Sequence, residues 1–159
     1  KYLKLYTTKS SSNMHLFDEN EQLKKYSNIS EIINEYMTIR LNAYQKRKEF
    51  IIKNLIHETT ILSNKARFIK MNLNGDIDLR FKTKKQVCDL LQDNQFEIID
   101  EDKDFKYLVK LPMDSVTKEK AESLNSEKDN KLKELNIIQE TTIKDMWKTE
   151  LTNLLKINF

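Results

Sequence analysis

From Asn28 to Leu73 the chain contains neither glycine nor proline, and its apolar side chains recur at intervals of three and four residues. This spacing places them on one face of a helix. The apolar positions are Ile29, Ile33, Met37, Leu41, Tyr44, Ile51, Leu55, Leu62, Ala66, Ile69 and Leu73. At about 1.5 Å per residue such a helix would be roughly 65 Å long, which is too long for the wall of a small globule. We therefore expect residues 28–73 to form one long helix, the first arm, that requires a partner.

The partner is predicted in residues 117–159, a stretch of similar length. Thr117 is a suitable cap for a helix start, and the apolar seam continues downstream. A second capping signal follows at Thr142, with Asp145 three residues later. The two stretches predict a mainly α fold built on a long antiparallel helical hairpin, a coiled coil. We expect the returning arm to be interrupted near 137–142.

Equal rise along two antiparallel helices also predicts which residues meet. Trp147 should pack near Tyr36 and Ile33. Leu124 should lie near Thr59. These two pairings test the register of the hairpin.

Residues 74–116, which we call the tip, hold Gly75 and Pro112, the only glycine and the only proline of the chain. Thr83 with Gln86 predicts a capping box that opens a short helix. An apolar run from Phe105 onward, around Pro112, is expected to be short and extended. We expect the tip to be a small helical domain that is too small to bury its own apolar surface.

Residues 1–27 alternate apolar and polar side chains and are predicted to form two or three short strands, with a turn at 18–21. So few strands are marginally stable alone, so the segment is expected to be the edge of a larger sheet.

The composition excludes several classes of protein. Charged residues make up 33% and hydrophobic residues 38% of the 159 residues, which argues against a single large core. One cysteine excludes an internal disulfide, and one glycine argues against glycine-rich phosphate loops. A net charge of +3 is too balanced for a nucleic-acid clamp by itself. No apolar stretch approaches the length of a membrane span.

The residues alone indicate no catalytic or metal site. Asp76 and Asp78 could hold a divalent cation, but nothing near them completes a ligand shell and a turn beside Gly75 explains both. The basic cluster Arg40, Lys46, Arg47 and Lys48 is more simply a solvated or salt-bridged helix face than a phosphate site. The lysines of the strand segment make a better case for contact with a nucleic-acid backbone. They are Lys1, Lys4, Lys9, Lys24 and Lys25, of which we single out Lys4, Lys9, Lys24 and Lys25.

Several short sequence motifs occur along the chain, and their combination and order are more specific than any one of them. They are Thr7-Thr8-Lys9-Ser10-Ser11-Ser12-Asn13-Met14-His15-Leu16-Phe17-Asp18, Arg40-Leu41-x-x-Tyr44-x-x-Arg47-Lys48, Leu62-Ser63-Asn64-Lys65-Ala66-Arg67-Phe68-Ile69, Tyr107-Leu108-Val109-x-Leu111-Pro112, Val116-Thr117-Lys118-Glu119-Lys120 and Asp145-Met146-Trp147-x-x-Glu150-Leu151. This set resembles the end of the tower domain, the coiled-coil arms and the carboxy-terminal gate (C-gate) of type IIA DNA topoisomerases from eukaryotes and large DNA viruses. The resemblance runs over essentially the whole chain.

Two positions depart from the family pattern. The family's turn after Phe-Asp usually carries glycine, where this chain has Glu21 after Asn20. Asparagine can adopt positive φ at modest cost, so a hairpin remains possible. The family often has proline before the Asp-Leu-Trp element, where this chain has Ile143.

The resemblance implies a role as a dimerisation gate. In that family two arms project from the DNA-cleavage core, and their tips meet across a two-fold axis and open to release the transported duplex. The implied partners are a second copy through the tip and DNA through the parent enzyme, with no membrane. The expected interface residues are Phe68, Ile69, Leu73, Tyr107, Leu108, Leu111 and Met113.

The resemblance also implies that the parent is an ATP-dependent isomerase that uses Mg²⁺, although no Arg-Tyr dipeptide, glycine-rich loop or strand-borne acidic cluster for that chemistry occurs in this chain. We therefore expect no catalytic, cofactor-binding or metal-binding residue here, and no activity of the fragment alone. The implied location is intracellular, at sites of DNA replication, in the nucleus or in a viral factory in the cytoplasm. The alternative is a non-enzymatic helical-hairpin adaptor or a nucleic-acid-binding dimerisation module.

Overall fold

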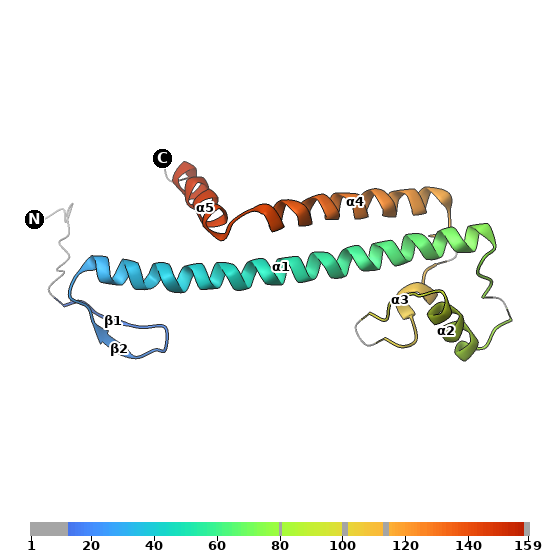
Figure 1. Cartoon of the computed structure of the whole chain (residues 1–159), viewed down its shortest axis with the longest axis horizontal. Helices are drawn as coiled ribbons and strands as arrows, with labels where there is room; N and C mark the ends of the chain where they lie inside the picture. Colours follow the sequence, from blue (N-terminus) through green and yellow to red (C-terminus); the bar gives the residue numbers. More distant parts are fainter. Residues whose placement is uncertain (1–12, 80, 100–101, 113–114, 158–159) are drawn as a thin grey trace, which may run out of the picture. The chain divides into compact units, whose positions relative to one another are not determined.

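The computed structural model describes residues 13–79, 81–99, 102–112 and 115–157. Within these ranges two strands are followed by five helices (Figure 1). They are β1 (His15–Phe17), β2 (Leu23–Lys25), α1 (Ile29–Asn74), α2 (Lys84–Asp93), α3 (Lys106–Val109), α4 (Lys118–Glu140) and α5 (Ile143–Ile157). A mainly α fold with a short antiparallel sheet at its start, as the sequence predicts, is thereby confirmed.

The chain divides into two compact units. Unit 1 comprises residues 1–47 and 143–159, and unit 2 comprises residues 48–142. Helix α1 contributes its first part to unit 1 and its second part to unit 2.

In unit 1 the two strands form an antiparallel hairpin in which Phe17 pairs with Leu23. The Asp18 carboxylate closes the turn by accepting hydrogen bonds from the backbone N–H groups of Asn20 and Gln22, both at 2.9 Å. The residue with positive φ is Glu21, at 61°, and not Asn20, which corrects the sequence-based expectation. The Asp18 side chain fixes the turn locally, which allows a residue other than glycine to adopt this backbone.

The start of α1 is capped and tied to the hairpin. The Asn28 side chain accepts a hydrogen bond from the Glu31 N–H at 2.9 Å, and the Glu31 carboxylate accepts one from the Ser27 N–H at 2.8 Å. One turn later the Glu35 carboxylate accepts hydrogen bonds from the Lys24 ammonium at 2.6 Å and from the Tyr26 hydroxyl at 3.0 Å. The last part of the hairpin therefore contacts the first turns of α1.

Aromatic side chains join α5 to α1 within unit 1. Trp147 lies against Tyr36 edge-on, with ring centroids 6.4 Å apart, and stacks on Tyr44 with centroids 6.1 Å apart. The predicted proximity of Trp147 to Tyr36 is confirmed, and Ile33 lines the same groove as Trp147.

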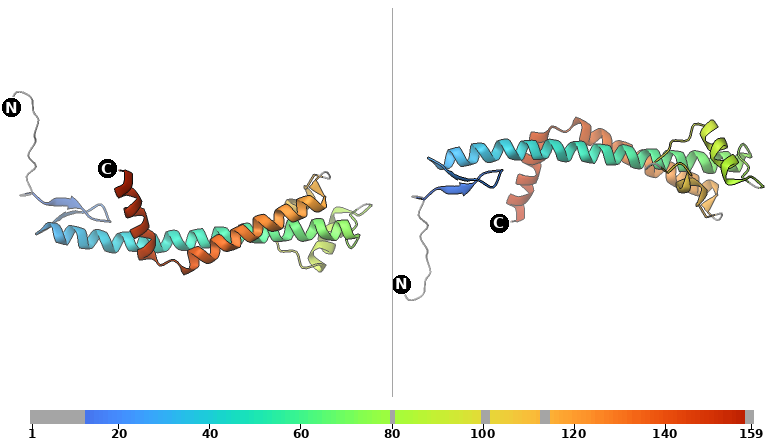
Figure 2. Two further views of the ribbon diagram at one scale, coloured as in Figure 1. Left: turned by 90° about the horizontal axis from the view of Figure 1, so that it is seen from above. Right: turned by 90° about the horizontal axis from the view of Figure 1, so that it is seen from below.

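In unit 2, α4 runs antiparallel alongside the second part of α1 in every view (Figure 2). Leu124 packs against Ala66 and Ile69, so the predicted proximity of Leu124 to Thr59 is wrong by about two helical turns. The Lys131 ammonium pairs with the Glu58 carboxylate at 3.0 Å, which agrees with the shifted register. The break after Glu140 falls inside the interval 137–142.

The tip has a core of its own. Its buried side chains are Phe68, Ile77, Val87, Leu91, Phe96, Phe105 and Leu108. Thr83 and Gln86 form the predicted capping box of α2, and Thr117 caps α4 through the Lys120 N–H. The run after Phe105 is helical as α3 and not extended, because Phe105 and Leu108 must point together into the core. Phe68 of α1 completes this core, so the tip covers apolar surface that we expected it to leave bare.

Leu111 borders two clusters. It packs against the tip core and also against the cluster of Ala66, Ile69 and Leu124, where α1 meets α4. No helix in the described part of the chain is both long enough and apolar enough to span a bilayer.

Candidate functional site

Three of the expected interface residues are covered by the chain itself. Phe68, Ile69 and Leu108 are 3%, 0% and 0% exposed. The first and third belong to the tip core, and Ile69 belongs to the cluster under α4. In a single chain these side chains are therefore not available to a partner, because periodicity marks an apolar position without showing what covers it.

Three others keep part of their surface. Leu73 is 42% exposed at the end of α1, and Tyr107 and Leu111 are half-buried. Met113 lies outside the described residues. The sequence missed three exposed apolar side chains of the tip, namely Phe81, Ile98 and Val109. Phe81 is fully exposed and has a φ of 60°. Neither property is expected of a phenylalanine from its residue type alone.

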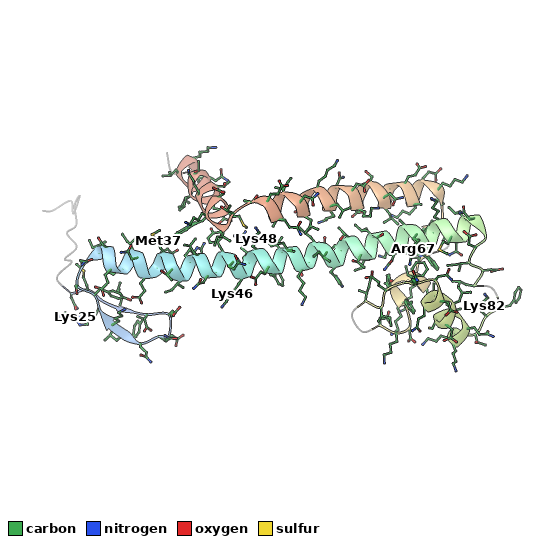
Figure 3. All side chains as sticks on the ribbon, viewed as in Figure 1. Lys25, Met37, Lys46, Lys48, Arg67 and Lys82 are labelled. Atoms are coloured by element: carbon green, nitrogen blue, oxygen red, sulfur yellow. The ribbon has the colours of Figure 1, made fainter. Side chains whose placement is uncertain are left out.

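Arg67 holds the end of α2 against α1, a role that the sequence did not reveal (Figure 3). Its guanidinium donates to the carbonyls of Asn94 and Gln95 at 3.2 and 2.8 Å, and lies 4.2 Å from the centre of the Phe96 ring. A cation at a helix carboxyl end complements the helix dipole, and its position over an aromatic face adds attraction. The tip is thereby fixed to the first arm.

Tyr107 connects the tip to α1 through two hydrogen bonds of its hydroxyl group. Its hydroxyl donates to the Glu97 carbonyl at 2.7 Å and accepts from the Asn64 amide at 3.1 Å. Burial raises the pKa of this hydroxyl above its ordinary value. Asn64 is itself buried, so this hydrogen bond satisfies a polar group that would otherwise be costly to bury.

Of the lysines singled out for a phosphate backbone, Lys24 and Lys25 are described, whereas Lys4 and Lys9 lie outside the described residues. Lys24 forms an ion pair with Glu35, and this hydrogen bond raises the pKa of the ammonium and lowers that of the carboxyl. Lys25 is exposed on β2. The positive charge of Lys24 is therefore partly neutralised by the Glu35 carboxylate within the same unit.

Part of the basic cluster on α1 has structural partners. The Lys48 ammonium donates to the backbone carbonyls of Gln139 and Thr141, at 2.9 and 2.8 Å, where α4 ends. Arg47 pairs with Glu150 at 2.7 Å. The Glu150 carboxylate also accepts a short hydrogen bond from Tyr44, and this bond together with Arg47 lowers its pKa.

The described residues contain no group of three or more His, Cys, Asp or Glu side chains that could hold a metal ion.

Comparison with known proteins gives a consistent result. The A-subunit family model of DNA gyrase/topoisomerase IV matches residues 1–152. The chain is 31% identical to human (Homo sapiens) DNA topoisomerase 2-beta over 95% of its length, and 32% identical to DNA topoisomerase 2 of Plasmodium falciparum over 92%. It covers 11% and 13% of these two relatives, so it spans about a tenth of their length.

A solved structure agrees with the fold. The crystal structure of the Plasmodium falciparum topoisomerase II DNA-binding, cleavage and re-ligation domain matches with a TM-score of 0.81 and 31% identity. The match covers 94% of this chain and 24% of that chain.

Proposed function

Because this chain belongs to the DNA gyrase/topoisomerase IV family and is a segment of a type IIA topoisomerase, we propose that its second unit is the carboxy-terminal dimerisation gate of that enzyme. The parent would be an ATP-dependent isomerase that passes one DNA duplex through another. This segment would supply the contact between two copies that opens to release the transported duplex. The chemistry of cleavage would reside elsewhere in the parent.

Exposed apolar side chains in and next to the tip are the observation that carries the proposal. Leu73 and Ile98 are 42% and 48% exposed, and Phe81 is fully exposed. A contiguous exposed apolar patch commonly marks an interaction surface, and the proposal requires these side chains to form one. A gate must hold two copies together and still open, so a modest patch suits it better than a large obligate interface.

Sedimentation equilibrium of the 159-residue chain over a hundredfold range of concentration tests the gate. We expect a reversible dimer, weakened about tenfold or more by Leu73→Asp, because a buried carboxylate at an interface is costly. Ile137→Asp is the matched control, since Ile137 is 64% exposed on α4 and lies outside the tip. Leu108→Asp would be uninformative, because Leu108 is in the core and the variant would unfold.

A strict monomer at all concentrations, or a dimer that both substitutions weaken equally, would contradict a gate at the tip. Such a result would favour the alternative function as an adaptor, because an adaptor binds a partner without self-association.

Contact of the strand segment with a DNA backbone is a separate proposal. Lys25 supports it best because its charge is exposed, whereas the charge of Lys24 is shared with Glu35. Lys25→Ala should weaken binding of duplex DNA at all sequences alike and reduce the salt slope by about one. Lys46→Ala, on an exposed face of α1, is the control. An unchanged salt slope would contradict this contact.

A further inference from the structure

The tip contains a groove that the proposed gate does not require. It has a volume of about 450 Å³, and its floor consists of Leu79, Val87, Cys88 and Val109. Its rim carries Lys82, Lys84, Lys106 and Lys110, with Asp104 as the one acidic residue of the described lining. A volume of this size lies within the range of small-molecule sites, and an apolar floor with few polar groups is typical of them.

The charges of the rim are only partly balanced. Asp104 accepts from Lys84 at 2.7 Å, and Lys106 lies 3.4 Å from Asp102 and 3.6 Å from Asp104. The hydrogen bond between Lys84 and Asp104 raises the pKa of the ammonium and lowers that of the carboxyl. The described lining of the groove holds four lysines against one aspartate, which is an excess of positive charge.

This excess decides what the groove can accept. A second copy of the chain placed groove to groove would bring two sets of lysines together, and like charges at close range oppose association. A DNA backbone would satisfy the lysines but would leave the apolar floor bare. A ligand with both an apolar body and an acid group matches the floor and the rim together.

We propose that this groove binds a small organic anion, in which an apolar ring or chain covers Leu79, Val87 and Val109 and an acid group lies between Lys82 and Lys110. The proposal rests on the lining of the groove and does not depend on the gate. Lys82 lies beside α2 at one side of the tip (Figure 3). Its long side chain and that of Lys110 can adjust to an anion without movement of the backbone.

The test uses two dyes that share an apolar body. 1-Anilinonaphthalene-8-sulfonate carries a negative charge, and N-phenyl-1-naphthylamine lacks the sulfonate. Amide chemical shifts of the 15N-labelled 159-residue chain would be followed during titration with each dye. We expect shifts at Leu79, Val87, Cys88 and Val109, and about tenfold tighter binding of the charged dye, which corresponds to about 1.4 kcal/mol.

The double variant Lys82→Glu/Lys110→Glu should abolish the preference for the charged dye. Lys85→Glu is the matched control, because Lys85 is exposed on α2 and does not line the groove. Val109→Asp should weaken both dyes, since it places a charge on the apolar floor at a side chain that is 44% exposed and therefore tolerates substitution. Equal binding of the two dyes, or shifts confined to the groove of unit 1 beside Trp147, would overturn the proposal.

Discussion

The ammonium of Lys48 donates a hydrogen bond to the backbone carbonyl of Thr141, which lies 93 residues later in the chain. A second bond reaches the Gln139 carbonyl, so one side chain of α1 satisfies two of the acceptors that the end of α4 leaves open. A motif of four basic residues thus contains a helix cap that no local pattern would indicate.

Lys48→Met should destabilise unit 2 by about 1–2 kcal/mol, because it removes charge-assisted hydrogen bonds at a helix carboxyl end while keeping the aliphatic stem. Urea unfolding followed by far-ultraviolet circular dichroism measures the change. Lys46→Met is the control, with an expected effect below about 0.5 kcal/mol, because Lys46 is exposed two residues away on the other face of α1 (Figure 3). Equal losses in the two variants would contradict the cap.

The pKa of Glu150 predicts how unit 1 responds to acid. The hydrogen bond from Tyr44, followed by that from Arg47, lowers this pKa below its ordinary value of 4.5. The folded chain therefore binds fewer protons at Glu150 than the unfolded chain does. The stabilisation is present above pH 4.5 and is lost as the pH falls through the lower folded value.

Trp147 fluorescence reports this change, because its ring stacks on Tyr44. Glu150→Gln should be less stable than the unmodified chain at pH 7 and should approach it in stability as the pH falls below 4.5 and through the lower folded value. A constant difference in stability between the two proteins across this range of pH would show that the ionised carboxylate contributes nothing.

Gln95 lies just after the carboxyl end of α2 and has a left-handed backbone conformation that favours glycine. Its φ is 57°, its N–H bonds to the Gln92 carbonyl at 2.9 Å, and the Phe96 N–H bonds to the Leu91 carbonyl at 3.1 Å. This pair of bonds is a Schellman motif. Gln95→Gly should raise the stability of unit 2 by about 1 kcal/mol by relieving left-handed strain. Gln95→Ala should bring no such gain in stability. If thermal melts showed that the alanine variant gains as much stability as the glycine variant, relief of strain would be contradicted as the cause.

Arg67→Ala should destabilise unit 2 by about 2 kcal/mol, since it removes two hydrogen bonds to carbonyls and the contact with the Phe96 ring. Arg67→Lys should recover less than half of the loss, because an ammonium cannot form the planar fork or stack in the same way. Complete recovery by lysine in urea unfolding would show that charge alone is responsible.

The long helix, its partner and the caps could be predicted because their signals are local. Residues 28–73 carry an unbroken apolar stripe, and Thr83 and Thr117 are caps whose hydrogen bonds lie within four residues. Trp147 near Tyr36 followed from equal helical rise. The position of Leu124 did not, because equal rise fixes the register of two helices only when one pair of facing residues is already known.

The candidate site was less predictable. Apolar periodicity cannot distinguish Leu108, which the tip core covers, from Leu73, which stays exposed, because covering depends on contacts distant in sequence. Glu21 and Gln95 adopt positive φ without being glycine, so no glycine marks the left-handed residue of either turn. Arg67 and Lys48 act on carbonyls of residues that are far away along the chain.

Leu111 has a consequence for how unit 2 comes apart. Its side chain is shared by the tip core and by the cluster between α1 and α4. Loss of one cluster therefore removes contacts from the other, which couples their unfolding. For this reason we expect residues 74–116 to melt together with α4 and the second part of α1 in one cooperative transition. A graft of the tip onto another hairpin would need to reproduce both sides of Leu111.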